Sequence, residues 1–148
     1  MVSPEILRRY PLFAGLSMHQ IDILAMVGQE VSLKKDHSFF EEGDDLNNFF
    51  LVMEGQAGII IKRPKIDVVY TTLGSGDVFG WSALVPPKTA TAGAKALTDC
   101  KVITFDGIEL WKKFEDDPQF GFIMMQRIAQ VIRKRLEYMR IETLAFFS

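Results

Sequence analysis

The segment from Leu73 to Leu84 reads LGSGDVFGWSAL, and it decides the fold class more than any other stretch. Within it, Gly74-Ser75-Gly76-Asp77 is typical of a tight turn that joins short strands. Further glycines, Gly43 and Gly55, lie beside acidic residues upstream. We predict turns with positive φ at these two glycines and at Gly76, because only glycine adopts that conformation cheaply.

Short β-rich runs alternate with such turns from Gln29 to Phe105. The runs are Glu30–Leu33, Phe49–Met53, Gly58–Lys62, Asp67–Thr71 and Lys101–Phe105. Many short strands between turn signals are typical of an antiparallel barrel or jelly roll. We therefore predict a β-roll over residues 29–105.

Helical patterns flank the β-rich region. Ser17 and Gln20 form a capping box, and Gly28 is a suitable stop for the helix that follows. A shorter helix is predicted before Pro11. At the other end, Asp106 with Glu109 resembles a second capping box and predicts a helix over residues 106–114.

A long helix is predicted over residues 117–143, because Asp117 is a capping residue and Pro118 suits the first helical position. Its apolar stripe holds Met125, Ile128, Ile132, Leu136 and Met139. Such a stripe needs a partner: it packs on the roll, or it pairs with a second copy of the chain. We favour a homodimer in which some residues, such as Phe120 and Ile123, pack on the roll. The basic face Arg133-Lys134-Arg135 with Arg140 is predicted to be solvated.

Length and composition favour one globular domain over residues 1–148, with a helical part at 1–28 and C-terminal helices at 106–143. The chain has a net charge of −2, 48% hydrophobic and 24% charged residues. Cys100 is the only cysteine, so an internal disulfide is excluded. No apolar run reaches the ~20 residues of a membrane span, and the N-terminus lacks a signal-peptide layout. We expect a cytoplasmic protein without membrane contact.

Four motifs in order resemble the cyclic nucleotide-binding domain family. They are FEEGD at 40–44, FLVMEG at 50–55, LGSGDVFG at 73–80 and ALTDC at 96–100. The segment 11–17, PLFAGLS, is similar to that family's first helical segment. The resemblance implies an α+β, mainly β fold: a roll (double-stranded β-helix, or jelly roll) of eight strands, with N-terminal helices and a long C-terminal helix.

The resemblance also implies a non-catalytic, ligand-sensing regulatory module in which occupancy of the roll biases the C-terminal helix. The family's phosphate cassette corresponds to Phe79-Gly80-Trp81-Ser82-Ala83-Leu84, whose backbone N–H groups would cradle an anion. The ligand-binding residues expected on this basis are Phe79, Gly80, Trp81, Ser82, Ala83, Leu84, Lys88, Thr89 and Ala90.

Two features of the family's cassette are missing. Trp81 stands where the family has a glutamate that accepts from the ribose 2′-hydroxyl. The family's phosphate-pairing arginine would lie near Ala90, yet no arginine occurs between Arg63 and Arg127, and Lys88 is the nearest basic residue. A lysine lacks the bidentate fork of an arginine. The cassette is therefore degenerate.

Several alternatives follow for the pocket. It binds a cyclic nucleotide (cAMP or cGMP), it binds another anionic or aromatic small molecule, or Trp81 plugs it and the chain is a ligand-free dimeric interaction protein. A sensor fragment of a transcription regulator is a further alternative. No Ser–His–Asp or Cys–His arrangement suggests an enzyme, and His19 and His37 lack the spacing of metal ligands.

The assigned elements use nearly the whole sequence. Residues 141–148 remain, and they are too few for a helix-turn-helix. We therefore expect no direct contact with nucleic acid, and an output that passes through a partner, a second copy or the final helix.

Overall fold

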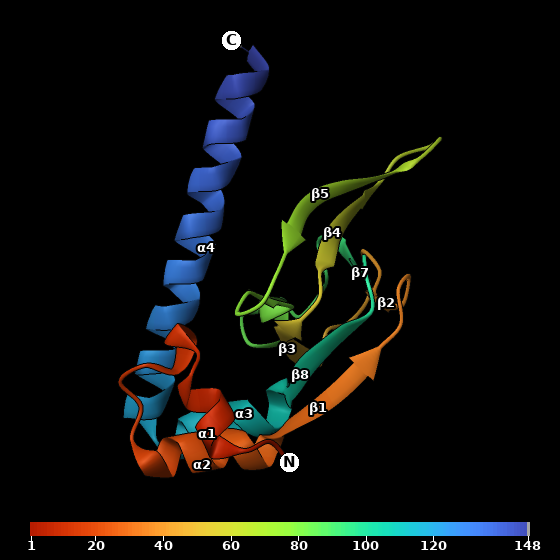
Figure 1. Ribbon diagram of the computed structural model, residues 1–148. Coiled ribbons are helices and arrows are strands. Elements are labelled where there is room, and N and C mark those ends of the chain that lie inside the picture. Colours follow the sequence, from red (N-terminus) through yellow and green to blue (C-terminus); the bar gives the residue numbers. More distant parts are fainter. Residues whose placement is uncertain (148) are drawn as a thin grey trace.

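Two antiparallel sheets of four strands each form a roll in the computed structural model, which describes residues 1–147 (Figure 1). The strand orders are β1-β8-β3-β6 and β2-β7-β4-β5. The strands are β1 (Gly28–Leu33), β2 (Ser38–Phe40), β3 (Asn48–Glu54), β4 (Ala57–Lys62), β5 (Asp67–Leu73), β6 (Val78–Phe79), β7 (Gly93–Ala96) and β8 (Cys100–Asp106). The predicted β-roll is confirmed, and β2, β6 and β7 are additions to the five predicted runs.

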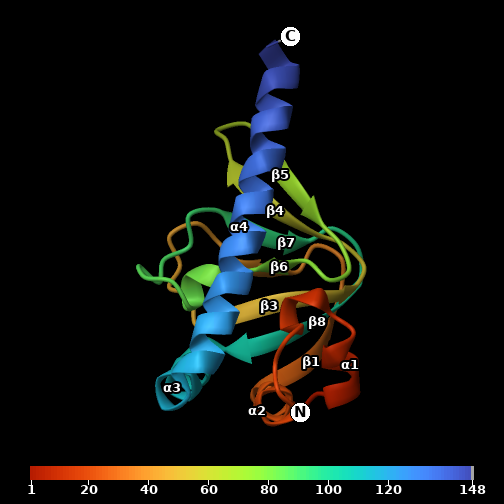
Figure 2. The same cartoon turned by 90° about the vertical axis from the view of Figure 1, so that its left-hand side faces the viewer.

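Helices cover one end of the roll, and the last of them runs past it (Figures 1 and 2). The α-helices are α1 (Pro4–Arg8), α2 (Met18–Val27), α3 (Gly107–Asp116) and α4 (Pro118–Phe147), and the 3₁₀ helices are η1 (Pro11–Phe13) and η2 (Trp81–Ala83). The final helix was predicted to end at residue 143. It continues to Phe147, because no glycine or proline interrupts residues 122–147.

Side-chain caps set the starts of α2 and α3. The Ser17 hydroxyl accepts from the Gln20 N–H at 3.1 Å, and the Gln20 side chain accepts from the Ser17 N–H at 2.9 Å, which confirms the predicted capping box. Asp106 caps α3 by accepting from the N–H groups of Ile108 and Glu109. The Glu109 carboxylate pairs with Lys112 at 3.8 Å instead of completing a second box.

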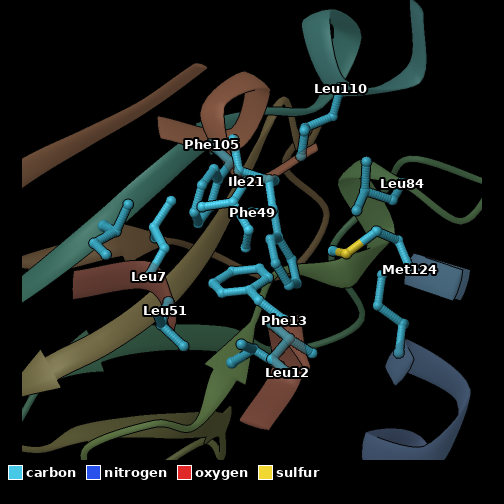
Figure 3. Packing of buried hydrophobic residues seen from close by; sticks show 14 of the residues in the cluster. Leu7, Leu12, Phe13, Ile21, Phe49, Leu51, Leu84, Phe105, Leu110 and Met124 are labelled. Carbon is cyan, nitrogen blue, oxygen red and sulfur yellow. The ribbon is translucent and has the colours of Figure 1, made fainter. Parts of the chain in front are cut away.

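One hydrophobic cluster joins the N-terminal helices, the first sheet and the base of α4 (Figure 3). Phe13, Phe49 and Phe105 lie at its centre, and Phe120 and Ile128 of α4 are fully buried in it. Ile128 therefore packs on its own chain and is unavailable to a second copy, so its assignment to a dimer stripe is wrong. The reason is that the first turns of α4 lie against α3 and η1.

A second cluster fills the space between the two sheets. The Phe50 and Phe79 rings stack at 4.8 Å between centroids, and Phe39 meets both edge-on. Tight turns close the strands around this cluster: Gly43, Gly55 and Gly76 have φ of +90°, +83° and +86°. The positive φ predicted for these three glycines is confirmed.

Asp117 lies between α3 and α4, and its carboxylate links α4 to α2 by hydrogen bonds. Its Oδ1 accepts from the Phe120 N–H at 3.2 Å and caps α4, while its Oδ2 accepts from the Gln20 side chain at 3.1 Å. The hydrogen bond from Gln20, followed by the one from Phe120, lowers the pKa of Asp117. A folded-state pKa below the unfolded value stabilises the fold above pH ~4, and this stabilisation is lost as pH falls through the folded pKa.

Asp117→Asn is therefore expected to lower the melting temperature at pH 6 and to lose this disadvantage progressively as the pH falls below about 4. Asparagine still accepts from the Phe120 N–H, so the cap is retained and the titrating charge is removed. Melting curves from pH 2.5 to 7 measure the effect, with Asp116→Asn at the neighbouring exposed position as the control for net charge. A gap between wild type and Asp117→Asn that stays constant over this pH range would contradict the assignment.

Candidate functional site

A cavity of about 320 Å³ lies between the second sheet, the segment after β6 and the middle of α4. Strand β4 contributes Ile59 and Ile61, and β5 contributes Tyr70 and Thr71. The remaining wall residues are Phe40, Leu46, Phe79, Gly80, Trp81, Ser82, Ala90, Thr91, Ala92, Gly93, Arg135 and Met139. The cavity therefore lies where the sequence places the cassette.

Gly80 sets the backbone conformation at the start of the cassette. Its φ is +78°, and a Cβ there would lie 3.0 Å from the Asn48 carbonyl oxygen and 3.0 Å from the Phe50 ring. Only glycine allows this approach, and it starts the short helix η2. Within the cassette the Ala83 N–H donates to the Gly80 carbonyl at 3.0 Å, and the Leu84 N–H donates to the Trp81 carbonyl at 2.8 Å. These two donors are thus engaged inside the cassette and are not directed at a ligand.

Arg135 brings a cation to the cavity from α4. Its guanidinium carbon lies 4.5 Å from the centroid of the Trp81 ring, and its NH2 group donates to the Val78 carbonyl at 2.7 Å. Burial lowers the pKa of Arg135, and the charge of Asp77 opposes this shift. An arginine remains protonated at neutral pH. The site thus holds a half-buried, oriented cation that stacks on an aromatic ring.

The structure brings together some of the residues assigned from the sequence and separates others. Phe79, Gly80, Trp81, Ser82 and Ala90 line the cavity. Ala83 and Leu84 are buried behind it and support the cassette from the core.

Lys88 and Thr89 do not line the cavity. Thr89 forms a β-bridge with Asp45, and the Lys88 carbonyl accepts from the Leu46 N–H at 2.8 Å. This backbone pairing holds both residues on the rim with exposed side chains. The structure therefore does not place Lys88, the nearest basic residue in the sequence, at the cavity wall, where the cation is Arg135.

The remaining stripe residues of α4 have three different environments. Met125 and Ile132 are half-buried against the core cluster, and Leu136 is 45% exposed. Met139 lines the cavity.

The prediction that Arg135 lies on a solvated face is wrong. Arg135 follows Ile128 by seven residues and Ile132 by three, so all three share one face of α4. That spacing was the available signal. It was obscured by the neighbouring charges of Arg133 and Lys134.

Charge at the site is one-sided. The cavity wall includes Arg135 and no aspartate, glutamate or lysine.

In residues 1–147 no cluster of histidine, cysteine and acidic side chains could hold a metal ion. Over the same residues no helix is both long and apolar enough to cross a bilayer.

Comparison with known proteins places these features in context. The model of the family described as "Cyclic nucleotide-binding domain" matches residues 30–117. The chain is 24% identical, over 88% of its length, to a CRP-like cAMP-activated global transcriptional regulator of Mycobacterium tuberculosis. It is 32% identical, over 72% of its length, to a cAMP-dependent protein kinase regulatory subunit of Schizosaccharomyces pombe. The matches span 58% and 25% of these two relatives.

Solved structures share the same architecture. A crystal structure of a protein from Geobacter metallireducens GS-15 has a TM-score of 0.83 and 29% identity, covering 92% of this chain and 99% of that one. A cyclic nucleotide-binding domain from Methylobacillus flagellatus KT has a TM-score of 0.81 and 20% identity, covering 95% and 80%. The second likeness shows the fold alone.

Proposed function

The chain belongs to the cyclic nucleotide-binding domain family, and from that premise we propose that it senses a small anionic ligand in the cavity between the roll and α4. Its curated relatives include a transcriptional regulator and a kinase regulatory subunit, which supports a regulatory rather than a catalytic role. The observation that carries the proposal is the Arg135 guanidinium held on Trp81 at the cavity wall.

An anion suits this wall for electrostatic reasons. Arg135 is half-buried, so its charge is less hydrated than that of a surface arginine, and an anion beside it would restore favourable interactions. Trp81 lines the cavity without filling it, and Ser82 adds a hydroxyl at the same wall. These features favour a ligand-binding role over a plugged pocket.

Cyclic nucleotides are the first ligands to test, because the names of two relatives specify cAMP. The cavity wall carries no carboxylate that could accept from a ribose hydroxyl. A hydrogen bond to a charged group contributes about 1.5–3 kcal/mol, so its loss weakens binding by roughly one to two powers of ten. We propose weak cyclic-nucleotide binding in which the phosphate contacts Arg135.

Isothermal titration with cAMP, cGMP and 2′-deoxy-cAMP tests this reading of the cassette. We expect cAMP and 2′-deoxy-cAMP to bind equally, within about twofold, since no charged acceptor reads the 2′-hydroxyl. A preference of tenfold or more for cAMP would contradict it. Absence of heat from these nucleotides and from small organic carboxylates alike would overturn the sensing role.

Ligand binding would be transmitted through α4. Arg135 and Met139 line the cavity, and both belong to the helix that continues past the roll (Figure 2). A ligand that contacts Arg135 therefore favours one position of α4 over others, which is a population shift between arrangements.

A second proposed feature is a homodimer along the free end of α4. The helix beyond Leu136 extends away from the roll with large exposed apolar side chains (Figure 1). An isolated helix of this length is marginal in water. The distal stripe, defined as Leu136, Thr143 and Phe146, has the spacing of seven and then three residues that occurs along a coiled-coil seam. This stripe favours a second copy of α4 as its partner.

A further inference from the structure

The charge of the cavity wall sets the first condition on its ligand. Arg135 is the ionisable cation of that wall, and the wall includes no acidic side chain. Among residues 1–147 Arg135 forms none of the ion pairs that the structure describes. The exposed Asp77 carboxylate, which is not part of the wall, also acts on Arg135. One negative charge on the ligand would pair with Arg135, whereas a second would have no cation at the wall.

The geometry of Arg135 sets the second condition. Stacking on Trp81 and donation to the Val78 carbonyl restrict the planar guanidinium to one orientation. A guanidinium has five N–H donors in a rigid fork that matches the two oxygens of a carboxylate. A preorganised fork loses less conformational freedom on binding than a free arginine does.

The rest of the wall sets the third condition, because it is mainly hydrocarbon. Its apolar side chains come from β2, β4, β6 and the segment before β3, and they line one space: Phe40, Leu46, Ile59, Ile61 and Phe79. Ring nitrogens and ribose hydroxyls would lose hydration against these side chains. Besides Arg135, the polar side chains at the wall are the hydroxyls of Tyr70, Thr71, Ser82 and Thr91. An apolar body gains free energy in proportion to the area it buries there.

Building on the proposed ligand site, we propose that its preferred ligand is an apolar monocarboxylate: a compact aryl or alkyl body with one carboxylate that pairs with Arg135. The site then recognises charge through α4 and shape through the roll. Such a ligand differs in class from a cyclic nucleotide and needs no acceptor for ribose.

Matched ligands test this proposal in the wild-type chain. Isothermal titration compares 3-phenylpropanoate with 3-phenylpropanamide, which has the same body and no charge, and with cAMP. We expect the carboxylate to bind at least about tenfold more tightly than the amide, because a hydrogen-bonded charge pair is lost in the amide. The carboxylate should also bind more tightly than cAMP.

Matched variants locate the interaction. Arg135→Met removes the fork while keeping an unbranched side chain, and should weaken 3-phenylpropanoate at least about tenfold without changing the amide. Arg133→Met removes an exposed charge two residues away, paired with Glu137 at 3.5 Å, and should leave both affinities unchanged. The wild-type comparison of acid and amide stays informative even if Arg135→Met loosens α4.

The outcomes separate this proposal from the one on which it rests. If cAMP binds more tightly than 3-phenylpropanoate and Arg135→Met weakens it, the anion sensor stands and the monocarboxylate class is wrong. Equal affinity of acid and amide overturns the pairing with Arg135. If none of the three ligands binds, both proposals fail.

Discussion

Replacing Gly55 by alanine is expected to destabilise the fold by about 3 kcal/mol, combining a strained φ with a steric clash. Gly55 has φ +83°, and an added Cβ would collide with the Asp99 carbonyl oxygen and lie 2.8 Å from the Cys100 Cβ. The opposing backbone cannot easily yield, because the Leu97 N–H donates to the Gln56 carbonyl at 2.9 Å. Urea denaturation followed by circular dichroism measures the loss as a lower midpoint at unchanged slope.

Gly43→Ala is the matched control. Gly43 has a similar φ of +90°, but nothing lies within 4 Å of the position of its Cβ. It isolates the conformational cost, about 1–2 kcal/mol. Equal destabilisation by the two variants would contradict the clash at Asp99.

Leu136→Asp is expected to convert the proposed α4 dimer to monomers. Leu136 starts the distal stripe and is 45% exposed in one chain, so the substitution is tolerated by the monomer. In a symmetric dimer the change occurs twice, and each unpaired carboxylate buried in the seam costs about 3–5 kcal/mol. The dissociation constant should rise by roughly four powers of ten or more. Sedimentation velocity over a concentration series measures it.

Tyr138→Asp controls for the added charge. Tyr138 is 61% exposed and lies about 200° around the helix from Leu136, off the stripe. It should leave the dimer intact. A wild-type chain that stays monomeric at every concentration, or a Leu136→Asp variant that stays dimeric, would show that this seam is wrong.

Local patterns were sufficient for most of the fold. The capping box at Ser17 and the apolar runs at Phe49–Met53 and Lys101–Phe105 were predictable, because they depend on neighbours within a few residues. Strand β6 has two residues, and β7 reads Gly-Ala-Lys-Ala. A two-residue segment is too short, and a Gly-Ala-Lys-Ala segment too low in β-propensity, to predict a strand locally. Both become strands because β3 and β4 offer partners.

The candidate site was predictable only on the side that is contiguous in sequence. The resemblance to the cyclic nucleotide-binding domain family indicates the cassette from Phe79 to Ser82, which is contiguous in sequence. Arg135 is separated from its hydrogen-bond partner Val78 by 57 positions, so no local pattern connects them. Lys88 is the basic residue nearest to the cassette in the sequence. Its side chain is exposed, and it does not line the cavity.

The sequence by itself determined the main strands of the roll, its positive-φ turns and the helix caps, because each depends on backbone conformations that a few adjacent residues select. The place of the cassette followed from the family resemblance and not from local conformation. Only the tertiary structure decided which face of α4 is covered. The base of α4 packs on α3 and η1, which buries Ile128 and directs Arg135 onto Trp81. A helix's own periodicity shows which residues share a face, but the packing of its neighbours decides where that face points.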